Sequence, residues 1–273
     1  ALIGLVDYGH TVSRDALAKG ADACRRALQL DPALAEGYAA WGRYRTAMRD
    51  SIGSAQAHAK AIALQPSYAG THQWSCWANL LMNRGAEALR FGAKAVRLDP
   101  LDPEAAGNKA VAHLMVGEPA LALEETGRIL ELHPRFEYAM WARGLSLQAL
   151  GRWDEAAAVF DRLTDRWTLG WPELGRAAAQ YQGGDTERLA TAGADLSGPE
   201  TGFERGMIHA LRGDLDGAFD LVREEWPFPW AESLYLYVHR GAPTANLAAD
   251  PRFERLKTEV LASWMVGEPE PTP

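Results

Sequence analysis

Cysteine is scarce in this sequence, and so are long apolar runs and excess positive charge. Cys24 and Cys76 are the two cysteines in 273 residues, too few for a disulfide framework and without metal-site spacing. The longest apolar runs have only a few residues, as in Ala1–Val6, so no segment is expected to span a bilayer. The net charge of −8 argues against a nucleic-acid partner, because phosphate-binding surfaces need clustered Lys and Arg.

Catalytic and targeting motifs are also missing. The seven histidines include no i, i+4 pair with a carboxylate between, and no kinase string or Gly-rich phosphate loop is present. Gly183, Gly184 and Asp185 are typical of a turn with a capping Asp. The N-terminus lacks the basic start and apolar middle of a secretion signal. We therefore expect a cytoplasmic, non-enzymatic chain without cofactor or metal.

Proline, in contrast, recurs with a period of 34 residues, at Pro32, Pro66, Pro100 and Pro134. A leucine stands two residues before each of these prolines. Small residues keep the same phase at Gly42, Cys76, Ala110 and Gly144, and again at Ser54, Ala88, Ala122 and Ala156. Between these two sets we expect turn glycines at Gly53, Gly85, Gly117 and Gly151. Because proline ends a helix and small residues let helices approach closely, each unit is predicted to be helix, turn, helix, proline.

This layout resembles the tetratricopeptide repeat, which closes each 34-residue helix pair with proline. The unit 137–170 matches best, with Gly144, Ala156 and Phe160 in place, and the units 35–68 and 69–102 match well. The unit 103–136 has Thr126 where a large aromatic residue is usual, and the first unit is degenerate, with Ser13 as the expected cap of a helix through Leu28. The resemblance implies an all-α fold, a right-handed tetratricopeptide superhelix over residues 1–170.

Residues 171–266 are predicted to continue the solenoid as irregular helical pairs and a capping helix. The expected pairs are 171–182 with 186–192, and 202–211 with 215–225. Asp250 and Pro251 are expected to start the last helix, whose apolar residues Phe253, Leu256, Val260 and Leu261 share one face. Residues 267–273 are Pro- and Glu-rich, and we expect them to be disordered.

Three strings give the resemblance a context: P-S-Y-A-G-T-H-Q-W at 66–74, R-L-D-P-L-D-P at 97–103 and L-A-A-D-P-R-F-E-R-L at 247–256. They look like the C-terminal repeat regions of bacterial signalling proteins with cyclase-like, winged-helix or Ser/Thr kinase architectures. In those proteins the repeats sense or scaffold, while the output domain lies upstream. The resemblance implies a sensor or scaffold and assigns no catalysis to these residues.

The resemblance also implies that the first helix of each unit lines a concave groove for a peptide or helix of a protein partner. At the corresponding repeat positions lie Arg43, Gln73, Trp74, Trp77, Asn108, Tyr138, Trp141 and Gln148. Trp74, Trp77, Tyr138 and Trp141 are expected to form an aromatic strip, with Gln73 and Asn108 as hydrogen-bonding groups. Trp in a helical repeat is also a common packing residue, and the sequence leaves both interpretations open. Tyr38, Trp41 and Tyr44 are interpreted as packing residues.

Other functions receive less support from the residues. The repeat positions of a carboxylate clamp for acidic peptides hold Ala39 and Arg43, Gln73 and Trp77, Gly107 and Val111, and Trp141 and Leu145. Asn108 alone matches such a clamp, so an acidic C-terminal peptide is not the expected ligand. His58 and Cys76 stand at packing positions and are interpreted as structural. The alternative function is a small-ligand receptor, with a pocket between the regular repeats and the C-terminal pairs. The oligomeric state is left open.

Overall fold

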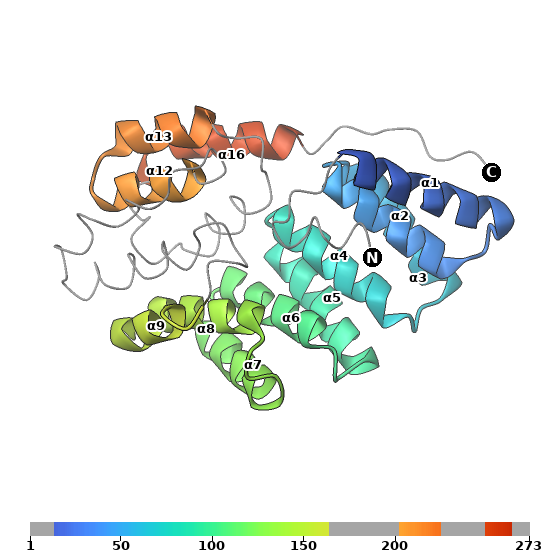
Figure 1. Ribbon diagram of the computed structural model, residues 1–273, viewed down its shortest axis with the longest axis horizontal. Coiled ribbons are helices and arrows are strands. Elements are labelled where there is room, and N and C mark those ends of the chain that lie inside the picture. The colour runs from blue at the N-terminus through green and yellow to red at the C-terminus, as the bar shows by residue number, and fades with distance from the viewer. Residues whose placement is uncertain (1–13, 164–201, 225–248, 264–273) are drawn as a thin grey trace. The chain divides into compact units, whose positions relative to one another are not determined.

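The computed structural model describes residues 14–163, 202–224 and 249–263. Every regular element within these ranges is an α-helix (Figure 1). The helices are α1 (Arg14–Leu30), α2 (Ala35–Ala47), α3 (Ser51–Leu64), α4 (Ala69–Leu81), α5 (Gly85–Leu98), α6 (Pro103–Met115), α7 (Pro119–Leu132), α8 (Glu137–Ala149), α9 (Trp153–Phe160), α12 (Gly202–Leu211), α13 (Leu215–Glu224) and α16 (Pro251–Ser263). The prediction of an all-helical solenoid is confirmed.

Two compact units can be distinguished, and each is described by itself. One holds the described residues up to Ala112 together with those from Glu259 onward, and the other holds those in His113–Thr258. Several expected features lie outside the described residues: the cap Ser13, the helical pair 171–182 and 186–192, the turn 183–185, and the tail 267–273. Of the helices in the described ranges, none is long and apolar enough to cross a bilayer.

The 34-residue period of the sequence is the period of the helices. The first helices α2, α4, α6 and α8 start at Ala35, Ala69, Pro103 and Glu137, and each has 13 residues. The second helices α3, α5 and α7 each have 14 residues and start with the same spacing. The four periodic prolines lie in the turns that follow second helices, where proline donates no helical hydrogen bond. The first helices begin at the residues where the sequence predicts the four repeats to start.

In three of the four repeats, the two helices pack through positions 16 residues apart, where a larger residue on one helix is met by glycine on the other. Gly42 on α2 lies under the ring of His58 on α3, and a side chain at Gly42 would overlap that ring. Gly144 on α8 lies under Phe160 on α9 in the same way, with Phe160 Cε1 2.7 Å from the place of a Gly144 Cβ. The packing role predicted for His58 is therefore confirmed.

The pair α4–α5 reverses this order. Cys76 is the larger residue on α4, and Gly92 replaces the aromatic residue on α5. The Cys76 sulfur lies 3.1 Å from the place of a Gly92 Cβ, and Cys76 is completely buried. In the next repeat the two positions hold Ala110 and Thr126, which are also completely buried. The repeats thus close this contact with different residue pairs, each of which is buried.

The turn between the two helices of a repeat contains one residue with left-handed backbone. This residue is Arg49 (φ 60°), Asn83 (φ 56°), Gly117 (φ 83°) or Gly151 (φ 72°), again 34 residues apart. The prediction of turn glycines is right for Gly117 and Gly151 and wrong for Gly53 and Gly85. Gly53 and Gly85 lie in the first turns of α3 and α5, where the backbone is helical.

Glycine is needed at position 53 because other side chains approach its backbone closely. A side chain at this position would overlap the side chains of Arg45 and Asp50, which form an ion pair with both groups buried. Asp50 Oδ1 also accepts a hydrogen bond from the Gly53 N–H at 2.8 Å, so Asp50 caps α3. The pair thereby joins the end of α2 to the start of α3.

The second compact unit repeats this connection with histidine. His113 Nδ1 lies 2.7 Å from Glu118 Oε2, and His209 Nδ1 lies 2.7 Å from Asp214 Oδ2. In each case, as in Arg45–Asp50, the basic residue lies in the last turn of the first helix of a pair, and the acidic residue five positions later directly precedes the second helix. These side-chain pairs tie together the two helices of a repeat across the turn.

The helix α1 supplies the N-terminal core of the first unit. Ala21, Cys24 and Leu28 on α1 pack with Trp41 and Tyr44 on α2. The rings of Trp41 and Tyr44 stack with centroids 4.9 Å apart, which confirms both as packing residues. The degenerate first repeat therefore contributes its second helix to the solenoid.

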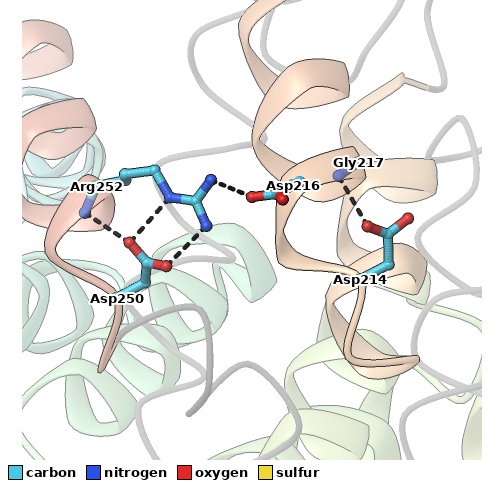
Figure 2. A network of polar contacts seen from close by, with 5 residues as sticks. All are labelled: Asp214, Asp216, Gly217, Asp250 and Arg252. Atoms are coloured by element: carbon cyan, nitrogen blue, oxygen red, sulfur yellow. Dashed lines mark hydrogen bonds and ion pairs between the residues drawn. The ribbon is translucent and has the colours of Figure 1, made fainter.

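The C-terminal helices α12, α13 and α16 follow the predicted boundaries closely. Asp250 Oδ1 accepts a hydrogen bond from the Arg252 N–H at 2.8 Å, so the expected cap of α16 is confirmed. Figure 2 shows how Arg252 also binds the Asp250 carboxylate and reaches Asp216 on α13, 2.6 Å away. Its guanidinium lies 4.4 Å from the centroid of the Phe219 ring. Phe253 and Leu256 are buried on the inner face of α16, as predicted.

Candidate functional site

The candidate site lies on the first helices of the first compact unit. The helix α4 contacts α2, and a hydrogen bond joins it to α6, so α2, α4 and α6 follow one another along this unit (Figure 1). Their expected groove residues are Arg43 on α2, Gln73, Trp74 and Trp77 on α4, and Asn108 on α6. We call the surface formed by these residues with Glu36, Tyr68 and Glu104 the first-helix face. It brings together five of the eight predicted site residues.

Trp74 is at the centre of this face and is half-buried. The Arg43 guanidinium lies 5.2 Å from the centroid of the Trp74 ring, in the range of a cation–π interaction. The ring of Tyr68 meets Trp74 edge-on, with centroids 6.4 Å apart and planes at 88°. The indole is thus held between neighbours from two other segments while part of its surface stays open to solvent. Trp77, one turn further along α4, is also half-buried.

The polar residues of the face link α4 to α6. Gln73 Nε2 donates a hydrogen bond to Glu104 Oε2 at 2.9 Å, and Gln73 itself is buried. Asn108, one turn beyond Glu104 on α6, is 6% exposed. This hydrogen bond fixes the side chains of Gln73 and Glu104 relative to each other.

The three remaining predicted site residues, Tyr138, Trp141 and Gln148, lie on α8 in the second unit and are buried. Trp141 is 0%, Gln148 1% and Tyr138 6% exposed. The rings of Tyr138 and Trp141 stack with centroids 5.8 Å apart and planes 13° apart. Because a fully buried indole has no surface for a partner, Trp141 serves packing in this arrangement. The expected aromatic strip is therefore divided between an accessible part on α4 and a buried part on α8.

Tyr68 is a member of the face that the groove positions of the sequence did not include. It directly precedes α4, where the repeat pattern gives no first-helix position. Burial raises the pKa of the Tyr68 hydroxyl, and the nearby Glu36 carboxylate raises it further. The aromatic type of Tyr68, six residues before Trp74, was the signal available in the sequence.

Burial keeps two titratable side chains of the described core, His58 and Cys76, in their neutral forms near pH 7. Burial lowers the pKa of His58 to about 4, and a hydrogen bond to the Ala39 backbone opposes this shift. Burial raises the pKa of the Cys76 thiol far above its usual range, which keeps the sulfur neutral and inert. The structural interpretation of Cys76 is confirmed by its burial. Within the described residues, no group of three His, Cys, Asp or Glu side chains is placed to bind a metal ion.

Comparison with solved structures gives the fold a name. A tetratricopeptide repeat protein from Parabacteroides merdae superposes with a TM-score of 0.61, over 97% of this chain and 96% of that one, at 13% sequence identity. The chain has the tetratricopeptide-repeat fold. PilW, a type IV pilus biogenesis factor, superposes with a TM-score of 0.52 over 86% of this chain and 95% of its own, at 17% identity. No family model matches the sequence. Among the described residues of this tetratricopeptide-repeat solenoid, Trp74 and Trp77 are half-buried on the first-helix face, and Trp153 is half-buried at the start of α9.

Proposed function

We propose that this chain is a protein-binding module, and not an enzyme, whose first-helix face takes a peptide or helix of a protein partner. The observation that carries the proposal is the partial exposure of Trp74 and Trp77 beside Arg43, on adjacent first helices. Tryptophan and arginine dominate the energetics of protein interfaces, because they supply a large contact area at low entropy cost. The buried Tyr138 and Trp141 then have a packing role in the second unit.

The composition of α4 supports a peptide ligand. This helix, A-G-T-H-Q-W-S-C-W-A-N-L-L, contains no acidic residue, no Lys and no Arg. Such a helix presents aromatic surface and amide groups, while its neighbours α2 and α6 carry charged residues. Apolar side chains of an extended peptide or an amphipathic helix can lie on the tryptophans. The net charge of −8 makes nucleic acid a poor partner.

The cellular setting is part of the proposal. The strings at 66–74, 97–103 and 247–256 favour a signalling or regulatory protein in which these repeats bind a partner for an output domain. Cys24 and Cys76 are both buried free thiols, which suits a reducing compartment such as the cytoplasm.

Affinity capture from lysate of the source cells tests the proposal. The baits are the wild type, Trp74→Ala with Trp77→Ala, and the control Trp153→Ala, which removes a half-buried tryptophan at the start of α9. Circular dichroism first establishes that all three are folded. A partner retained by the wild type and the control but lost by the double variant supports binding at the first-helix face. Equal capture by all three baits contradicts it.

A further inference from the structure

The charges that flank α4 indicate what kind of side chain the first-helix face accepts. Glu36 and Glu104 occupy the same repeat position, the second residue of α2 and of α6. On α4 the equivalent residue is Gly70, which adds neither charge nor bulk. The two carboxylates therefore lie on either side of α4, at the end where the first helices begin.

The aromatic pair Tyr68–Trp74 lies between these two carboxylates. On one side, the Glu36 charge acts on the Tyr68 hydroxyl, so the two groups are near each other. On the other side, Glu104 accepts a hydrogen bond from Gln73, the residue next to Trp74. Glu36 is exposed, while Tyr68, Trp74 and Glu104 are half-buried, so all four have surface in contact with solvent.

Arg43 shows which chemistry suits this surface. Its guanidinium lies 5.2 Å from the centroid of the Trp74 ring, so this ring is already in contact with one cation. Arg43 is seven residues beyond Glu36 on α2, about 10 Å along the helix axis. At that end the face combines aromatic rings with negative charge.

We propose that the first-helix face selects a basic peptide, with a Lys or Arg side chain seated between Glu36 and Glu104 on the Tyr68–Trp74 pair and an apolar neighbour on Trp77. This inference rests on the proposed function and specifies its partner. Aromatic rings and carboxylates together attract a cation, since both present negative charge to it. The net charge of −8 favours the approach of a basic partner from a distance.

A display library of random twelve-residue peptides, selected against purified chain, tests this specificity. The baits are the wild type, Glu36→Gln with Glu104→Gln, the charge reversal Glu36→Lys with Glu104→Lys, and Trp74→Ala with Trp77→Ala. The control Glu87→Gln with Glu131→Gln removes the same charge from exposed positions on α5 and α7. We expect the wild type and the control to enrich peptides with Lys or Arg beside an apolar residue, and the charge reversal to enrich acidic peptides.

Fluorescence polarisation with a synthetic copy of the leading peptide then measures how strongly its basic residue depends on the two carboxylates for binding. Glu36→Gln with Glu104→Gln should weaken its binding about tenfold, as expected for two partly exposed charge pairs. Replacing the peptide's basic residue by norleucine should cause a similar loss in the wild type and little further loss in that variant. Tryptophan-dependent peptides without basic residues would overturn the inference and leave the proposed function standing. If no enriched peptide depends on Trp74 and Trp77, both fail.

Discussion

Acid should destabilise this fold through His58. The imidazole is 4% exposed, lies over Gly42 and has no hydrogen-bond partner for Nε2 within the described residues. Its pKa is lowered from 6.5 to about 4 in the folded state, while the unfolded chain keeps the ordinary value. In the unfolded state His58 therefore binds a proton below pH 6.5, whereas in the folded state it binds one only below about pH 4. From pH 7.5 to pH 5, this difference lowers the free energy of unfolding by roughly 2 kcal/mol.

The variant His58→Phe isolates this contribution. Phenylalanine should be accommodated, because Phe160 covers Gly144 at the same repeat position. Urea unfolding, followed by circular dichroism at pH 7.5 and pH 5, gives the acid-induced loss for each protein. The wild type should lose roughly 2 kcal/mol more than His58→Phe, since the contributions of the carboxyl groups are common to both. The control His133→Gln, at an exposed turn residue, should behave as the wild type. An equal loss in wild type and His58→Phe would refute the reasoning.

Three further substitutions test the packing and the turns by urea unfolding. Gly117→Ala should lower the free energy of unfolding by about 1 kcal/mol through backbone strain alone, since nothing lies within 4 Å of an added Cβ. Gly117→Asn should lower it less, because asparagine tolerates left-handed backbone. Asp50→Ala should lower the free energy of unfolding by about 3–5 kcal/mol, because Arg45 stays buried without the Asp50 carboxylate. If this single variant loses less stability than the double variant Arg45→Leu with Asp50→Ala, the reasoning is contradicted. Phe160→Ala should cost about 3–5 kcal/mol through the cavity above Gly144, and an unchanged unfolding midpoint would show that α9 does not depend on this contact.

The fold was predictable because the repeat encodes its own boundaries. Proline and small residues act locally, so their 34-residue spacing sets where α2, α4, α6 and α8 begin. The turns were harder to predict, since glycine serves both left-handed backbone and close helix contacts. Gly53 has the second role, while Arg49 and Asn83 adopt the left-handed conformation without being glycine. Residue type alone does not distinguish these cases.

The candidate site was predictable only in part, because exposure depends on neighbours from other helices. Trp74 and Trp141 both stand at groove positions of the repeat, yet the first is half-buried and the second is covered completely. The stacking of Trp141 on Tyr138 is set by the packing around α8, which repeat position does not record. Tyr68 was missed because it precedes its helix. Repeat position thus predicts the side of the helix on which a side chain lies. Packing against neighbouring helices decides how much of that side chain is exposed to solvent.

The alternation of large and small residues across the helix pairs limits how this protein can evolve. A second helix carrying His58 fits a first helix with Gly42 and would collide with one carrying Cys76. Conversely, the helix with Gly92 would leave a void opposite Gly42. Recombination or duplication that exchanges whole repeats preserves each contact, whereas exchange of single helices breaks it. The unit that can be exchanged without loss of packing is therefore the helix pair of one repeat. A chimaera should be joined at the prolines that follow second helices.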